Sequence, residues 1–215
     1  LSGTDLTGTI LTEADLTQAN LTGVDLSGKD FGLSTMSGTE KIGTIFTGAN
    51  LSDTNLTGVD LSGKDLTGTI FTGANLSDTN LTGVDLSGKD LTGTILPGVN
   101  LSNTNLTEMI LTGADLSNAN LAGKDLSGKD LTGTIFTGAN LSNTTLLDVN
   151  LTDANLQNAD LRYTLLVDAN LLNAILTGAD LSEAILSGAI LTGANLENAI
   201  LTNTILNCIG HSICI

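Results

Sequence analysis

The chain has 215 residues with a formal net charge of −16; 40% of its residues are hydrophobic and only 2% are aromatic. This length fits a single domain, and the apolar fraction argues against a disordered chain. The acidic balance disfavours direct binding to nucleic acid, which requires a basic surface. No apolar run approaches the roughly 18 residues that would predict a membrane span. The sequence begins at Leu1 rather than Met and shows no signal peptide, so we interpret it as a mature product or a fragment.

A five-residue period runs through the whole sequence. The 215 residues divide into 43 pentads in one frame, and slot 1 of the pentad is Leu or Phe except at Met36, Lys41 and His211. Slot 2 is mostly Ser or Thr, and slot 3 is mostly Gly. Slot 4 is usually a small residue, chiefly Ala or Thr, and slot 5 is mainly Asp, Asn or Ile. On an α-helix this period would scatter the leucines around the axis, and on a flat strand it would alternate their faces. The leucines share one core only if the chain turns once per pentad.

Slot 3 indicates how the chain turns. Gly, Asn and Asp tolerate the positive φ that a type II turn requires at its third residue. The pair Pro97-Gly98 places the two preferred central residues of such a turn in slots 2 and 3. Each pentad is therefore predicted to be a short extended side followed by a corner.

Tandem motifs resemble the pentapeptide-repeat family, whose pattern is A(D/N)LXX. The motif appears at Ala19-Asn20-Leu21, Ala49-Asn50-Leu51, Ala114-Asp115-Leu116 and Ala194-Asn195-Leu196, among others. The resemblance implies an all-β fold, a right-handed quadrilateral β-helix with four pentads in each coil, slots 1 and 4 inward and the other slots outward. The 43 pentads then give about ten to eleven coils. We expect one solenoid over residues 1–215, with an end segment at 206–215.

The segment 31–42 interrupts a longer repeat, because it stands where only two residues stand in the copy at 56–80. We expect it to form a loop that projects from the solenoid as a recognition element, and two degenerate pentads are the alternative. The candidate loop residues are Phe31, Leu33, Met36, Glu40 and Lys41.

Slot 5 faces outward, so residues twenty positions apart should form columns on one face. One column contains the acidic residues Asp65, Asp85 and Asp125, and we interpret it as a candidate acidic face. Towards the C-terminus the same column becomes apolar at Leu165, Ile185 and Ile205, which predicts a contact surface. Drift within a tolerant repeat is the alternative. The further residues of this candidate interface are Ile175, Ile190 and Ile200.

Five lysines occupy slot 4, which faces inward. Burial of an unpaired ammonium group is costly, so we expect the stems to be buried and the ammonium groups to reach solvent near slot-5 Asp residues. Functional lysines with a lowered pKa are the alternative. The five are Lys29, Lys64, Lys89, Lys124 and Lys129.

The sequence shows no catalytic constellation. The single histidine, His211, has no nucleophile and base around it in the pattern, so we predict no enzyme activity, no cofactor and no metal. His211 lies between Cys208 and Cys214. The default interpretation is two thiols packed as small apolar groups, with a disulfide or a three-ligand metal site as alternatives.

These observations lead to three functional hypotheses. The first is a non-enzymatic scaffold that binds protein partners and self-associates through its C-terminal third, as a homodimer or end to end. The second, implied by the family resemblance and the net charge of −16, is an acidic mimic of DNA that regulates DNA gyrase or another topoisomerase. The third is an extracellular ordered surface, such as an ice-binding face, built from slot-2 Ser and Thr.

Overall fold

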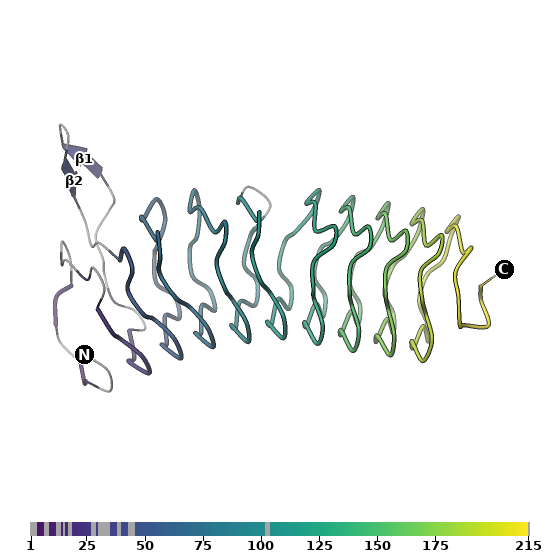
Figure 1. Ribbon diagram of the computed structural model, residues 1–215, viewed down its shortest axis with the longest axis horizontal. Coiled ribbons are helices and arrows are strands. Elements are labelled where there is room, and N and C mark those ends of the chain that lie inside the picture. The colour runs from purple at the N-terminus through teal and green to yellow at the C-terminus, as the bar shows by residue number, and fades with distance from the viewer. Residues whose placement is uncertain are drawn as a thin grey trace. The chain divides into compact units, whose positions relative to one another are not determined.

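The computed structural model resolves two compact units, Leu1–Ile110 and Leu111–Ile215, which are described separately (Figure 1). The predicted single solenoid over the whole chain stays a prediction. The structure describes residues 4–6, 9–11, 14, 16, 19–26, 29, 35–37, 40–42, 46–101 and 104–214.

Parallel pairing between residues twenty positions apart builds both units. In the second unit, one column of slot-5 residues pairs in the order Asp125, Thr145, Leu165, Ile185 and Ile205. In the first unit, Asn55 pairs with Asn75 and Asp60 with Asn80 in the same way. A separation of twenty residues corresponds to four pentads per coil. The predicted right-handed quadrilateral β-helix is therefore confirmed.

Slots 1 and 4 form the core, as the resemblance implied. Leu156 and Ala159 of the second unit are fully or almost fully buried, and so are Phe46 and Phe71 of the first. Burial of each leucine side chain contributes about 1.5–3 kcal/mol to the free energy of unfolding. Stacked leucines in successive coils can therefore hold the solenoid together with few aromatic side chains.

Each corner is closed by one hydrogen bond and one left-handed residue. The slot-4 N–H donates to the slot-1 carbonyl, as Ala154 does to Leu151 at 3.0 Å. Between them the slot-3 residue has a positive φ, +74° at Gly188 and +56° at Asn173. This geometry explains why Gly, Asn and Asp dominate slot 3.

Several threonine hydroxyls in slot 4 join one coil to the coil before it, whereas those of Thr144 and Thr164 donate within their own pentad. Thr134 Oγ1 donates to the carbonyl of Leu111 at 2.9 Å, and Thr204 Oγ1 to that of Leu181 at 2.8 Å. In the first unit, Thr69 donates to Phe46 at 2.9 Å. Donor and acceptor are 23 residues apart in each case, so the slot-1 carbonyl accepts a hydrogen bond from a threonine of the following coil.

A β-hairpin occupies part of the predicted loop. Strands β1 (Thr35–Ser37) and β2 (Glu40–Ile42) pair antiparallel, with Met36 opposite Lys41 and Ser37 opposite Glu40. Figure 1 shows this hairpin projecting from the coils of the first unit. Met36, Glu40 and Lys41 of the candidate loop lie in it, whereas Phe31 and Leu33 lie outside the described residues. Its recognition role stays a prediction.

In the part of the chain that the structure describes, no helix has the length and apolar character needed to cross a bilayer.

Replacing Thr134 with valine tests the link between coils. Thr134→Val removes the hydroxyl that donates to Leu111 while keeping the shape of the side chain. We expect the free energy of unfolding, measured by urea denaturation, to fall by about 1–2 kcal/mol. The control is Thr137→Val at the outward slot 2, which should change it by less than about 0.5 kcal/mol. Equal effects at the two positions would contradict the proposed role of the buried hydroxyl.

Candidate functional site

The structure brings the three residues of the predicted apolar strip together. Leu165 pairs with Ile185, and Ile185 pairs with Ile205, so the three lie on consecutive coils of the second unit. The side chains of Leu165 and Ile205 are 36% and 50% exposed, and Ile185 is half-buried. Three adjacent branched apolar side chains thus point out from one face.

Two further apolar residues extend this strip and were missed from the sequence. Leu147 and Val167 occupy slot 2 and are half-buried. Val167 lies on the same side of its strand as Leu165, because side chains two residues apart share a face. The N–H of Asp148 donates to the Val167 carbonyl at 3.0 Å, which places Leu147 beside Val167. We call Leu147, Leu165, Val167, Ile185 and Ile205 the apolar face.

The signal that would have found Leu147 and Val167 is present in the sequence. Both replace the Ser or Thr that is usual in slot 2, and they are twenty residues apart.

The remaining candidate interface residues lie on other sides of the coil. Ile175 pairs with Asn155 and Asn195, and Ile200 pairs with Asp180, so neither has an apolar partner in its column. Ile190 pairs with Asn170 on one side and with Ile209 on the other. All three isoleucines are exposed, but none joins the column of Leu165.

Hydrogen bonds within the corners engage the predicted acidic residues. In the first unit, Asp65 Oδ1 accepts from the N–H and hydroxyl of Thr67 at 3.0 and 2.6 Å, and Asp85 Oδ1 accepts from the N–H of Ser87 at 2.9 Å. In the second unit, Asp125 Oδ1 accepts from the N–H and hydroxyl of Ser127 at 3.0 and 2.6 Å. Asp and Asn in slot 5 therefore stabilise the backbone turn that follows them.

These bonds also change the ionisation of the carboxyl groups. The Ser87 N–H, followed by its hydroxyl and by Lys89, holds the pKa of Asp85 below its usual value. The Ser127 hydroxyl, followed by its N–H, does the same for the pKa of Asp125. The fold itself thus accounts for carboxylates in this slot, before any partner is considered.

A small polar cavity lies beside two of these acids. It has a volume of about 200 Å³ and is lined by Lys64, Asp65, Leu66, Thr67, Gly68, Asp85, Ser87 and Lys89. Asp65 forms no β-bridge in the structure, although the slot-5 residues Asp60 and Ile70 on either side of it do. The cavity therefore lies where the pairing between coils is locally interrupted.

Lys89, which lines this cavity, donates a hydrogen bond to the main chain. It is only 7% exposed, and its Nζ donates to the carbonyl of Leu66, 23 residues earlier. Lys29 Nζ makes the same bond to Leu6 at 2.6 Å. Burial lowers the pKa of Lys89, and Asp65 and Asp85 oppose that shift. The expectation that the ammonium groups of these lysines reach solvent is wrong for Lys89. Lys89 is buried, and its ammonium group donates to a slot-1 main-chain carbonyl, as the hydroxyl of the slot-4 residue Thr69 does.

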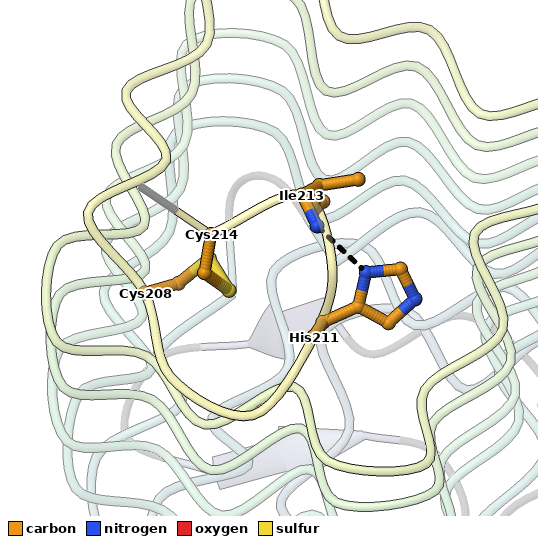
Figure 2. The surroundings of a disulfide bond; sticks show 4 residues. All are labelled: Cys208, His211, Ile213 and Cys214. Carbon is orange, nitrogen blue, oxygen red and sulfur yellow. Dashed lines mark hydrogen bonds between the residues drawn. A yellow bond between two sulfur atoms is a disulfide. The ribbon is translucent and has the colours of Figure 1, made fainter.

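The end segment contains a disulfide. Cys208 and Cys214 are bonded, with their Cα atoms 4.8 Å apart, and His211 lies between them in the sequence (Figure 2). His211 Nδ1 accepts from the N–H of Ile213 at 3.3 Å. The default interpretation of two packed thiols is wrong, because their close approach allows a bond. Among the described residues, no group of three or more His, Cys, Asp or Glu side chains is placed to hold a metal.

The corner carboxylates predict a loss of stability in acid. Because the folded-state pKa of Asp85 and Asp125 is lowered, their contribution is present above the unfolded-state pKa of about 3.9 and is lost as the pH falls through the folded-state values. Asp85→Asn/Asp125→Asn keeps the acceptor oxygens but cannot titrate. We expect its free energy of unfolding to fall less steeply than that of the unmodified chain between about pH 5 and pH 2.

The reverse substitution is the control for this experiment. Asn140 Oδ1 accepts the same two bonds from Ser142, at 3.0 and 2.7 Å. Asn140→Asp should therefore steepen the dependence on pH. Parallel curves for all three proteins would show that the corner bonds do not favour the ionised form.

Removal of the disulfide should destabilise the second unit. For a loop closed by residues six positions apart, the chain-entropy model predicts a loss of about 2 kcal/mol for Cys208→Ser/Cys214→Ser, measured by urea denaturation. Ser212→Ala within the same loop is the control and should have little effect. Mass spectrometry after alkylation without reductant checks the bond itself, and modification of both cysteines would contradict it.

Comparison with known proteins identifies the family. The model of pentapeptide repeats matches in eight copies, over residues 1–38, 42–73, 49–88, 74–113, 90–123, 110–148, 148–188 and 176–207. No curated protein sequence matches the chain significantly.

Several solved structures are similar. HetL, a pentapeptide repeat protein involved in heterocyst differentiation regulation in the cyanobacterium Nostoc sp. strain PCC 7120, is 31% identical, with 92% of this chain and 90% of that chain covered and a TM-score of 0.48. Rfr23 from the cyanobacterium Cyanothece 51142 is 31% identical, with 59% and 91% covered and a TM-score of 0.39. A trypsin-treated variant of QnrB1, a plasmid-mediated fluoroquinolone resistance protein, is 20% identical, with 88% and 78% covered and a TM-score of 0.47. Since the family model matches nearly the whole sequence, this chain belongs to the pentapeptide-repeat family.

Proposed function

We propose that this protein is a non-enzymatic scaffold that self-associates through the apolar face. The observation that carries the proposal is the stacking of Leu165, Ile185 and Ile205 on consecutive coils with their side chains partly exposed. A contact surface of this kind is expected where apolar side chains gather on the outside of a soluble fold.

The apolar face departs from the residue types that the corner favours. Asp125 accepts two hydrogen bonds from Ser127 through its slot-5 carboxylate, whereas the side chains of Leu165 and Ile185 cannot accept any. Each such bond contributes about 0.5–1.5 kcal/mol. Local stability therefore favours Asp or Asn in slot 5, and three successive apolar residues in one column indicate a different use for this face.

We propose a second copy of the chain as the partner of the apolar face, because this face is an uncharged part of an acidic surface. The formal net charge of −16 makes two copies repel each other wherever acidic residues meet. The apolar face contains no charged residue, and the exposed slot-3 residues Asp148 and Asp168 lie at its edge. A two-fold arrangement would bury the same patch on both copies and leave these carboxylates at the rim.

The hypothesis of DNA mimicry has less support. Asp65, Asp85 and Asp125 bind their own corners, so their presence follows from the fold. QnrB1 is a fluoroquinolone resistance protein, but a likeness at 20% identity shows the fold alone.

An ordered hydroxyl surface also has less support. Slot-2 hydroxyls donate to slot-5 side chains, as Thr132 does to Asp130 and Ser142 to Asn140, which reduces their capacity to order water.

Molar mass in solution tests the proposal. By size exclusion with light scattering, we expect the unmodified chain to form a dimer or larger species and Leu165→Ser/Ile185→Ser/Ile205→Ser to be a monomer. The matched control is Ile70→Ser/Ile95→Ser/Ile110→Ser, three exposed isoleucines of the first unit that do not pair with one another. The control should keep the mass of the unmodified chain. A monomer before any substitution, or equal dissociation of both variants, would refute self-association through this face.

A further inference from the structure

The chain contains one arginine and one tyrosine, and they are neighbours, Arg162 and Tyr163. They occupy slots 2 and 3 of one corner in the second unit, where other pentads usually have Ser or Thr followed by Gly or Asn. The Arg162 side chain is 50% exposed and Tyr163 is 57% exposed. Arginine and tyrosine are enriched among the residues that dominate binding energy at protein interfaces.

Tyr163 adopts a backbone conformation that does not suit it. Its φ is +60°, and every other non-glycine residue with positive φ in the described part of the chain is Asp, Asn or Glu. The left-handed region is costly for a bulky side chain, which has no short polar group to hydrogen-bond the backbone locally. A strained residue of this kind indicates a requirement other than folding.

The Arg162 side chain is held in one orientation. Its Nε donates to Asp160 Oδ1 at 2.8 Å, and its Nη2 donates to Asp160 Oδ2 at 2.6 Å. The Arg162 N–H still donates to Asp160 Oδ1 at 3.1 Å, so the usual corner bond is kept. The guanidinium is therefore held beside Asp160 and pairs with that carboxylate.

The surroundings of the pair are acidic. In the next coil, Asp180 pairs with Asp160, and the Asp180 Oδ2 lies 3.9 Å from Arg162 Nε. The Tyr163 N–H donates to the carbonyl of Ser182, which places Glu183 beside the tyrosine corner. Three carboxylates therefore accompany one guanidinium. Asp180 also accepts from the Ser182 hydroxyl at 2.6 Å and Glu183 from Asn203 at 2.7 Å, but these donors are neutral, so the excess of negative charge favours a positively charged partner.

We propose that the Arg162–Tyr163 corner is a contact site for a basic protein segment whose arginine or lysine side chain stacks on the Tyr163 ring and pairs with Asp180 and Glu183. An exposed tyrosine ring with carboxylates beside it offers both a cation–π contact and a charge-assisted hydrogen bond. The slot-5 residues of this site, Asp160 and Asp180, belong to a different column from Leu165. The site adds a heterologous partner to the proposed self-association.

Arg162→Ser/Tyr163→Asn tests this site without damaging the fold. It restores the residue types of ordinary corners, such as Ser142 followed by Asn143 one coil earlier, so we expect an unchanged or higher melting temperature. The variant also removes one positive charge, so unspecific attraction of a polycation to the acidic chain should increase. A loss of binding can therefore come neither from unfolding nor from net charge.

The probe is a labelled oligoarginine peptide at physiological ionic strength, with binding followed by fluorescence anisotropy. We expect the double variant to bind roughly tenfold more weakly than the unmodified chain. Asp125→Asn/Asp130→Asn, which removes two charges elsewhere in the second unit, should keep the affinity within about twofold of the unmodified chain.

Tyr163 gives a second measurement, because the chain has no tryptophan and no other tyrosine. Binding of an unlabelled peptide should change the intrinsic tyrosine fluorescence of the unmodified chain. Equal or tighter binding by the double variant, or peptide binding that leaves Tyr163 fluorescence unchanged, would overturn the proposal.

Discussion

In the described pentads from residue 46 to residue 205, the third residue lies in the left-handed region of φ, and there the backbone turns to the next side of the coil. At Gly188 and Asn173 this geometry is inexpensive, and the slot-4 N–H closes the turn onto the slot-1 carbonyl. The turn aims slots 1 and 4 inward at every side, so small and branched side chains fill the interior. The remaining structure, from parallel pairing to the leucine stacks, depends on this repeated corner.

The same corner decides the chemistry of the outer surface. It favours Asp or Asn before the turn and a hydroxyl after it, so most exposed polar groups bind their own backbone. Functional information is therefore carried by the positions that depart from this rule. In the apolar face, Leu165 and Ile185 stand where Asp or Asn side chains could accept the hydrogen bonds of the corner. In the Arg162–Tyr163 corner, Tyr163 has a strained backbone conformation with a positive φ. A partner would recognise these exceptions, since the regular pentads present nearly the same surface everywhere.

Periodicity predicted that the chain turns once per pentad, and the family resemblance implied the four pentads per coil from which the stacking of Leu165, Ile185 and Ile205 follows. Periodicity did not predict the features that depend on contacts formed only in the folded chain. Lys89 binds a main-chain carbonyl that no residue pattern marks, and the spacing of Cys208 and Cys214 left three chemistries open until the end segment brought the sulfurs together. Leu147 and Val167 can be found from the sequence, because both are apolar residues in slot 2 and lie twenty positions apart.

The direction of the buried threonine bonds has a consequence for biosynthesis. Thr134 donates to the carbonyl of Leu111, and Thr204 donates to that of Leu181, so these coils receive a side-chain hydrogen bond from the coil translated after them. The ribosome delivers coils in that same order, and each newly emerged coil completes its predecessor. The least finished coil is then always the newest one, close to the ribosome. Growth of the solenoid from the N-terminus would leave only one incompletely bonded layer exposed at any moment, whatever the number of repeats.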